Sequence, residues 1–173
     1  MKRAAFLAAA VLLAGCDGQD NAAPDAREPT PPALVPGEAK LPPQAEDYPI
    51  LASKECADVA EFYLEAISSR EYAQAALVWE DPVIDGARLE AVFGAYQEAQ
   101  VEWPEPFVEG AAGSLYCTVS GKLTDAGDPA KPAHEGTLLL RRVNDVPGAT
   151  PEQLRWTLQS STFVENLERS SRG

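Results

Sequence analysis

The spacing of apolar residues changes midway through this 173-residue chain, and that change limits the possible folds more than any other feature. Between Cys56 and Tyr96 the apolar residues recur three or four positions apart, as on one face of an α-helix. From Leu115 onward they alternate with polar residues, as on one face of a β-strand. Helices followed by strands are typical of an α+β fold, in which helices cover an antiparallel sheet.

The helical part predicts three helices. The first begins after Ser53, a plausible cap, and its apolar stripe is Cys56, Val59, Ala60, Tyr63, Ala66 and Ile67. The second has the stripe Tyr72, Ala75, Ala76 and Trp79 and is stopped by Asp81-Pro82. The third opens at Asp85-Gly86, and its stripe is Leu89, Val92, Phe93 and Tyr96. Because each stripe is narrow, each helix is expected to cover a neighbouring element.

The second half predicts about four antiparallel strands. Three of them span 115–123, 137–143 and 153–164, and a shorter one lies around Phe107-Val108. The connections 124–132 and 144–151 are polar and contain Gly and Pro, which are typical of loops.

The N-terminus has the pattern of a secretion signal over residues 1–15. Lys2 and Arg3 precede ten apolar residues from Ala4 to Leu13. A helix of that length rises about 15 Å, half of a bilayer core of about 30 Å, so it is too short for a permanent span. We expect no transmembrane helix elsewhere in the chain.

The apolar run ends in Leu13-Ala14-Gly15-Cys16, which resembles the lipobox of bacterial lipoproteins. The resemblance implies cleavage between Gly15 and Cys16, acylation of Cys16 with chains such as palmitate, and a lipid anchor that faces the periplasm. Asp17 resembles a signal for retention in the inner membrane, although an outer-membrane address stays open. Cleavage would remove two positive charges and take the formal charge from −13 to −15, with no basic cluster to bind nucleic acid.

Residues 16–49 form a predicted acidic linker rich in Pro and Ala. Eight prolines and few large apolar residues leave this segment without a core. We expect it to act as a stalk that separates a single domain, 50–173, from the membrane.

The order of helices and strands resembles the nuclear transport factor 2-like (NTF2-like) family, also called SnoaL-like or cystatin-like α+β rolls. Residues 59–75 resemble its first two helices and the turn between them, and residues 154–159 resemble a late strand. The resemblance implies a curved sheet around a conical pocket, and homodimers are common in that family. Tyr63, Tyr96, Tyr116 and Trp156 are candidates to line the pocket.

The resemblance also packs the first helix on the sheet, so Cys56 and Cys117 are candidates for a disulfide in an oxidising compartment. Two separate buried thiols are the alternative. No cofactor is expected. No metal site is expected either, because there is no Cys-x-x-Cys motif and the single histidine, His134, is remote in sequence.

The sequence contains no recognisable catalytic set. His134 sits in a loop setting just before a strand, and Asp81, Asp85 and Glu102 are the candidates for a buried carboxylate. Glu102, Glu105 and Glu109 surround Trp103 and Phe107, a cluster that suits a solvated edge, a bound cation or a basic partner, of which we favour the solvated edge.

Three functions therefore stay open. We favour a non-catalytic envelope lipoprotein that binds a ligand or a partner protein. The alternatives are a small isomerase, dehydratase or hydrolase, and a structural accessory subunit of an envelope complex.

Overall fold

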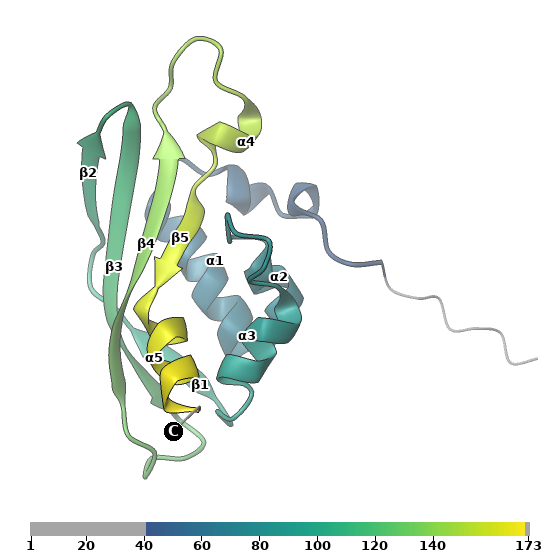
Figure 1. The fold of residues 1–173 in the computed structure, drawn as a ribbon, viewed down its shortest axis with the longest axis vertical. Helices are drawn as coiled ribbons and strands as arrows, with labels where there is room; N and C mark the ends of the chain where they lie inside the picture. Colours follow the sequence, from purple (N-terminus) through teal and green to yellow (C-terminus); the bar gives the residue numbers. More distant parts are fainter. Residues whose placement is uncertain (1–40, 172–173) are drawn as a thin grey trace, which may run out of the picture. The chain divides into compact units, whose positions relative to one another are not determined.

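The computed structural model describes residues 41–171, and its five-stranded antiparallel sheet with packed helices confirms the α+β prediction. The helices are α1 (Cys56–Ser68), α2 (Tyr72–Ala76), α3 (Gly86–Phe93), α4 (Pro151–Leu154) and α5 (Thr162–Ser170), with 3-10 turns η1 (Ala45–Asp47) and η2 (Pro49–Ala52). The strands are β1 (Ala99–Glu102), β2 (Phe107–Ala111), β3 (Ser114–Asp125), β4 (His134–Val143) and β5 (Thr157–Ser161). Figure 1 shows α1, α2 and α3 together on one side of the sheet. The sheet has one strand more than the four or so predicted, and α4 and α5 follow the three helices that the sequence predicts.

Helix α1 buries the stripe that the sequence predicts. Four of its residues are at most 2% exposed: Val59, Ala60, Tyr63 and Ile67. Glu55, rather than Ser53, occupies the N-cap position. The Ser53 hydroxyl instead accepts the N–H of Glu55 (3.1 Å) and donates to the Asp58 carboxylate (2.6 Å). Ser53 thus orders the turn that enters the helix.

The second predicted helix is shorter than expected, whereas the third begins where predicted. Helix α2 ends at Ala76, and Trp79 instead forms a parallel bridge with Leu158. Two main-chain hydrogen bonds join this segment to Leu158, so it covers the edge of β5. Helix α3 is capped by Asp85, whose carboxylate accepts the N–H of Arg88 (2.8 Å).

One edge of the sheet is formed by two short strands, β1 and β2, which pair with different parts of β3. The strands follow the order β1-β3-β4-β5, and β2 also pairs with β3. Strand β1 pairs with residues 122–125 of β3, and β2 pairs with residues 114–118. Because β4 occupies the other side of β3, β1 and β2 lie on the same edge, separated by residues 103–106. The strand predicted around Phe107-Val108 is confirmed as β2, whereas β1 was not predicted.

Two glycines lie opposite each other where other elements approach β3 and β4 closely. Gly121 pairs with Gly136. A β-carbon at Gly121 would lie 2.8 Å from the carbonyl oxygen of Glu102, and one at Gly136 would lie 2.5 Å from the Phe163 ring. Glycine at both positions therefore lets β1 and α5 pack directly on the two long strands, which curve in Figure 1.

The prediction of one strand over 153–164 is wrong at both ends. Its start belongs to α4, which Thr150 caps by accepting the N–H of Gln153 (3.4 Å). Its end belongs to α5, where the Ser161 side chain accepts the N–H of Val164 (3.4 Å). Only β5 is extended in this segment. Two capping side chains therefore decide the local structure.

The remaining boundaries change little. Strand β4 begins at His134, so this residue lies in the strand rather than before it. None of the helices within residues 41–171 is both long and apolar enough to cross a membrane.

Candidate functional site

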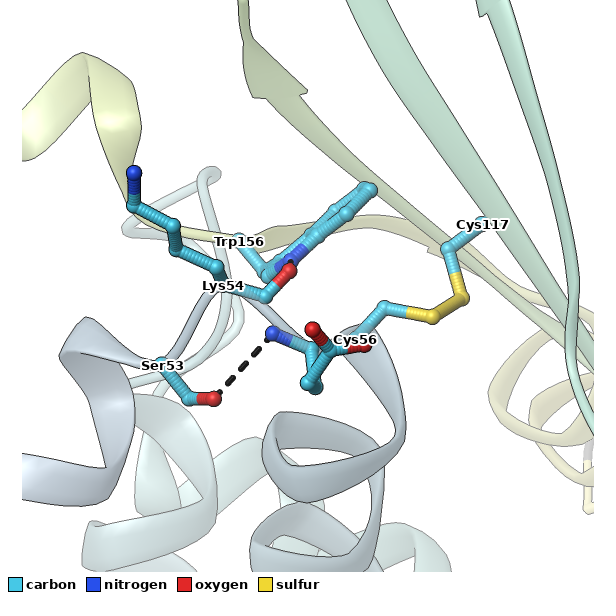
Figure 2. Close-up of a disulfide and its surroundings, with 6 residues drawn as sticks. Ser53, Lys54, Cys56, Cys117 and Trp156 are labelled. Atoms are coloured by element: carbon cyan, nitrogen blue, oxygen red, sulfur yellow. Dashed lines mark hydrogen bonds between the residues drawn. A yellow bond between two sulfur atoms is a disulfide. The ribbon is translucent and has the colours of Figure 1, made fainter. Parts of the chain in front are cut away.

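The disulfide between Cys56 and Cys117 joins the first residue of α1 to the first half of β3. The two sulfur atoms are bonded, and the Cα atoms are 6.4 Å apart. Both residues are buried, at 4% and 0% exposure. Figure 2 shows the bond reaching from the helix across to the sheet beside Trp156. The predicted pairing is therefore confirmed, and it occupies the space between α1 and the sheet.

Trp156 fills the same region from the other end of the sequence. Its side chain is among the largest fully buried ones, and its indole N–H donates to the carbonyl oxygen of Lys54 (2.9 Å). Figure 2 places the indole close to the Lys54 main chain. The Arg142 guanidinium lies 5.9 Å from the indole ring and pairs with Asp145. The interior between the start of α1 and the sheet is thus packed with side chains.

Tyr63 lies deep in the core, edge-on to Trp79 with ring centroids 6.3 Å apart. Burial raises the pKa of Tyr63, and the side chain of Trp79 lowers it to a smaller degree. The Tyr63 hydroxyl and the Trp79 indole N–H are both buried without a partner that satisfies hydrogen-bond geometry within residues 41–171. Burial therefore keeps this phenol protonated at neutral pH.

The buried carboxylate of the described residues, Asp125, is held by donors. It accepts main-chain N–H groups of Gln97 and Glu98 (both 2.9 Å) and of Gly127 (3.2 Å), and Lys131 lies 3.3 Å away. Burial raises its pKa, but the hydrogen bonds of Glu98 and Gln97 and the Lys131 ammonium together lower it to about 2. Asp125 is thus ionised at neutral pH and joins the end of β3 to the segment before β1.

A hollow of about 390 Å³ lies between α3 and α5. Arg88 on α3 and Glu168 on α5 form a two-pronged ion pair at 2.7 and 3.1 Å. Lys131 lies 3.9 Å above the ring of Tyr96, and half-buried His134 also lines the hollow. The sequence did not predict this grouping, because its members come from four separate parts of the chain.

The hollow lacks the pieces of an acid–base pair. No hydrogen bond to the His134 ring occurs within residues 41–171, and the carboxylate of Glu168 is engaged by Arg88. The Tyr96 hydroxyl is buried without a hydrogen-bond partner in this part of the chain. The His134 ring therefore has no partner among these residues of the kind that orients a general base.

The candidate carboxylates do not face the interior. Asp81 and Asp85 are exposed, and each accepts a nearby main-chain N–H group, from Val83 and Arg88 respectively. Glu102 is exposed at the end of β1. The structure therefore places all three on the surface, outside the core.

The four candidate pocket residues do not surround one cavity. Tyr63 and Trp156 are buried in the core, and Tyr96 lines the hollow between α3 and α5. Tyr116 alternates with buried Cys117 on β3, so it lies on the opposite face of the sheet. Gly15 and Cys16, the predicted cleavage and lipidation site, lie outside the described residues.

Comparisons with known proteins give no family. No family model matches the chain, and no curated protein matches it. Among solved structures, a protein described as a dehydratase from the NTF2-like family of Streptomyces avermitilis superimposes with a TM-score of 0.44 at 12% identity, over 62% of this chain and 91% of that one. A protein described as a calcium/calmodulin-dependent protein kinase type II association domain from Thiobacillus denitrificans gives 0.42 at 18% identity, over 61% and 90%. Because both TM-scores are below 0.5, neither likeness supports an argument about what this chain does.

Proposed function

We propose that this chain is a lipid-anchored protein of the bacterial cell envelope, and that its α+β domain, an NTF2-like roll, is a non-catalytic module that binds a partner. In this proposal the signal of residues 1–15 directs export, Cys16 carries the lipid, and the part of the predicted linker that precedes the described residues holds the domain away from the membrane. The end of that linker, from Ala45 to Pro49, is part of the domain, because Ala45 and Tyr48 pack against its core. Helices that precede a curved antiparallel sheet and cover one of its faces support the NTF2-like assignment.

The disulfide is the observation that carries the proposal. A disulfide between Cys56 and Cys117 persists in an oxidising compartment. The periplasm, to which the predicted signal would export the chain, is such a compartment. Together with Trp156 it fills the space between α1 and the sheet, where a pocket enzyme of this architecture would hold its substrate. The surface positions of Asp81, Asp85 and Glu102 support the same conclusion.

Anchoring is tested by mass spectrometry of the full chain expressed in a bacterium. We expect a mature N-terminus at Cys16 that carries a diacylglyceryl group, recovered with membranes. The Cys16→Ser variant is the control, and it should leave the lipid-carrying fraction. An unmodified Cys16 in the mature wild-type protein would overturn the anchoring part of the proposal.

The binding role is tested by crosslinking the tagged, lipidated protein in its own membranes and identifying what co-purifies with it. We expect an envelope protein in a constant ratio to the chain. If no protein is crosslinked and a small molecule is carried through purification instead, the partner-binding role is overturned, and the hollow beside His134 becomes the site to study for a ligand or a substrate.

A further inference from the structure

The interrupted edge formed by β1 and β2 has an unpaired main chain. Strand β2 pairs only with β3 among the described strands, so its other side offers free N–H and C=O groups. All five residues of β2 are exposed, and none is proline, so each amide that points away from β3 is available as a donor. The prolines at 104 and 106 lie in the interruption, outside β2. Such an edge is a template for another strand.

Two large apolar side chains on β2 are exposed to solvent. Phe107 is 65% exposed and Val108 is 47% exposed. They are neighbours in a strand, so they point to opposite faces of the sheet. An added strand that carries apolar residues would cover one of these side chains on each face. Apolar side chains exposed beside unpaired main-chain groups indicate a binding surface, whereas single apolar residues scattered over a surface do not.

A hollow of about 380 Å³ continues this edge between α1 and β1. The charged side chains that line it are all acidic: Glu61, Glu65 and Glu102. Trp103 and Leu64 supply part of its apolar wall. Glu102 stands opposite Lys122 in the β-ladder, yet no ion pair joins these two side chains within 4.0 Å.

The acidic character extends along the edge. Glu105 in the interruption and Glu109 on β2 are both exposed, and neither belongs to an ion pair among residues 41–171. A second copy that paired β2 with β2 about its centre would place Glu109 opposite Glu109, which is unfavourable. The chain as a whole carries −13, which also opposes self-association. A basic partner is favoured on both counts.

We propose that the edge from Glu102 to Ala111 receives an extended, basic segment of a partner protein, which adds to β2 as a further strand and places a Lys or Arg side chain in the hollow beside Trp103. Main-chain hydrogen bonds to β2 would supply the pairing, and apolar residues of the segment would cover Phe107 and Val108. The carboxylates would select Lys and Arg, and the Trp103 ring would face the cation. This inference deepens the proposed function and rests on its claim that the domain binds a partner protein.

The test uses the full mature chain in detergent micelles and three labelled eight-residue peptides. The first alternates Lys and Val, the second replaces Lys with Glu, and the third has the sequence of the first with every peptide nitrogen methylated, which removes all of its donors to a β-ladder. We expect only the first peptide to bind, with weaker binding at higher salt and slower hydrogen exchange at residues 107–111. Equal binding of the N-methylated peptide, or unchanged exchange in β2, would overturn strand addition.

Paired charge variants locate the surface. The triple variant Glu102→Gln, Glu105→Gln, Glu109→Gln should weaken binding about tenfold or more. The matched control, Glu46→Gln, Glu71→Gln, Glu165→Gln, removes the same charge from exposed positions elsewhere and should bind like the wild type. Equal weakening in both triple variants would mean that only net charge matters, and would overturn the proposed location.

In-cell crosslinking distinguishes this inference from the proposed function. A photoreactive residue in place of Val108 should capture the partner, whereas one in place of Glu165 on α5 should not. Capture only from α5 would leave the partner-binding role in place and overturn the edge as its site. Capture of a second copy of this chain from position 108 would replace the basic partner with self-association.

Discussion

The indole N–H of Trp156 donates a 2.9 Å hydrogen bond to the carbonyl oxygen of Lys54, across 102 positions of sequence. This bond joins the residue before β5 to the turn before α1, next to the disulfide (Figure 2). It therefore joins the segment that enters the first long helix to the segment that enters the last strand.

Trp156→Phe should lower the free energy of unfolding by about 2–3 kcal/mol, because it removes this hydrogen bond and leaves a void in the core. Urea unfolding followed by circular dichroism measures the change. Val146→Ala, at a side chain that is 49% exposed, is the control and should change stability little. A loss below about 0.5 kcal/mol for Trp156→Phe would mean that the region relaxes to fill the space.

Removing the disulfide should cost more. Cys56 and Cys117 are 61 positions apart, and in the chain-entropy model closing a loop of that length contributes about 4 kcal/mol. We expect the double variant Cys56→Ala, Cys117→Ala to lose roughly that amount and to lose its response to reducing agents. If dithiothreitol lowers the midpoint of the double variant as much as that of the wild type, the effect does not come from this bond.

The sequence predicts the long periodic elements well and the short ones poorly. The stripe of α1 and the alternation in β3 and β4 cover enough residues to fix both the element and its buried face. Strand β1 has four residues, of which only Ala99 is buried, so its alternation carried no clear signal. The local signals that were missed are caps: Thr150 before α4 and Ser161 before α5.

The candidate sites depend on contacts that are distant in sequence. The meeting of Cys56 with Cys117 was predictable once a helix and a strand were expected to pack face to face. The hollow that brings Arg88 and Glu168 to His134 was not predictable, because it requires the unpredicted helix α5. The acidic group Glu102, Glu105 and Glu109 was visible in the sequence, but the unpaired side of β2 was not.

Asp125 should make stability depend on pH in the acid range. Its pKa is lowered from 3.8 to about 2 in the folded protein, so the stability it contributes is present above pH 3.8 and is lost as the pH falls toward 2. Asp125→Asn should therefore be less stable than the wild type at pH 5–7, and the difference should shrink steadily between pH 3.8 and 2. Unfolding titrations at several pH values measure this.

The control is Asp128→Asn, in the loop that follows β3, which affects a single side-chain hydrogen bond, accepted from the N–H of Ala130. It should run parallel to the wild type across the acid range. A constant difference between Asp125→Asn and the wild type from pH 2 to 7 would contradict the role of the Asp125 charge and leave only the shape of the side chain.

Gly136→Ala should destabilise the domain through α5. The added β-carbon would lie 2.5 Å from the Phe163 ring, and this ring is 3% exposed, so it has little room to move. We expect a loss of about 1–3 kcal/mol, the usual cost of overpacking, together with faster hydrogen exchange in α5.

The control is Gly113→Ala. A β-carbon there meets no atom within 4 Å, but the residue has φ near +81°, so any loss of stability reports backbone strain alone and hydrogen exchange in α5 should stay unchanged. Combining Gly136→Ala with Phe163→Leu should recover part of the stability, because a smaller side chain leaves room for the methyl group. If this second change adds to the loss instead, the contact between Gly136 and Phe163 does not limit the packing of α5 on the sheet.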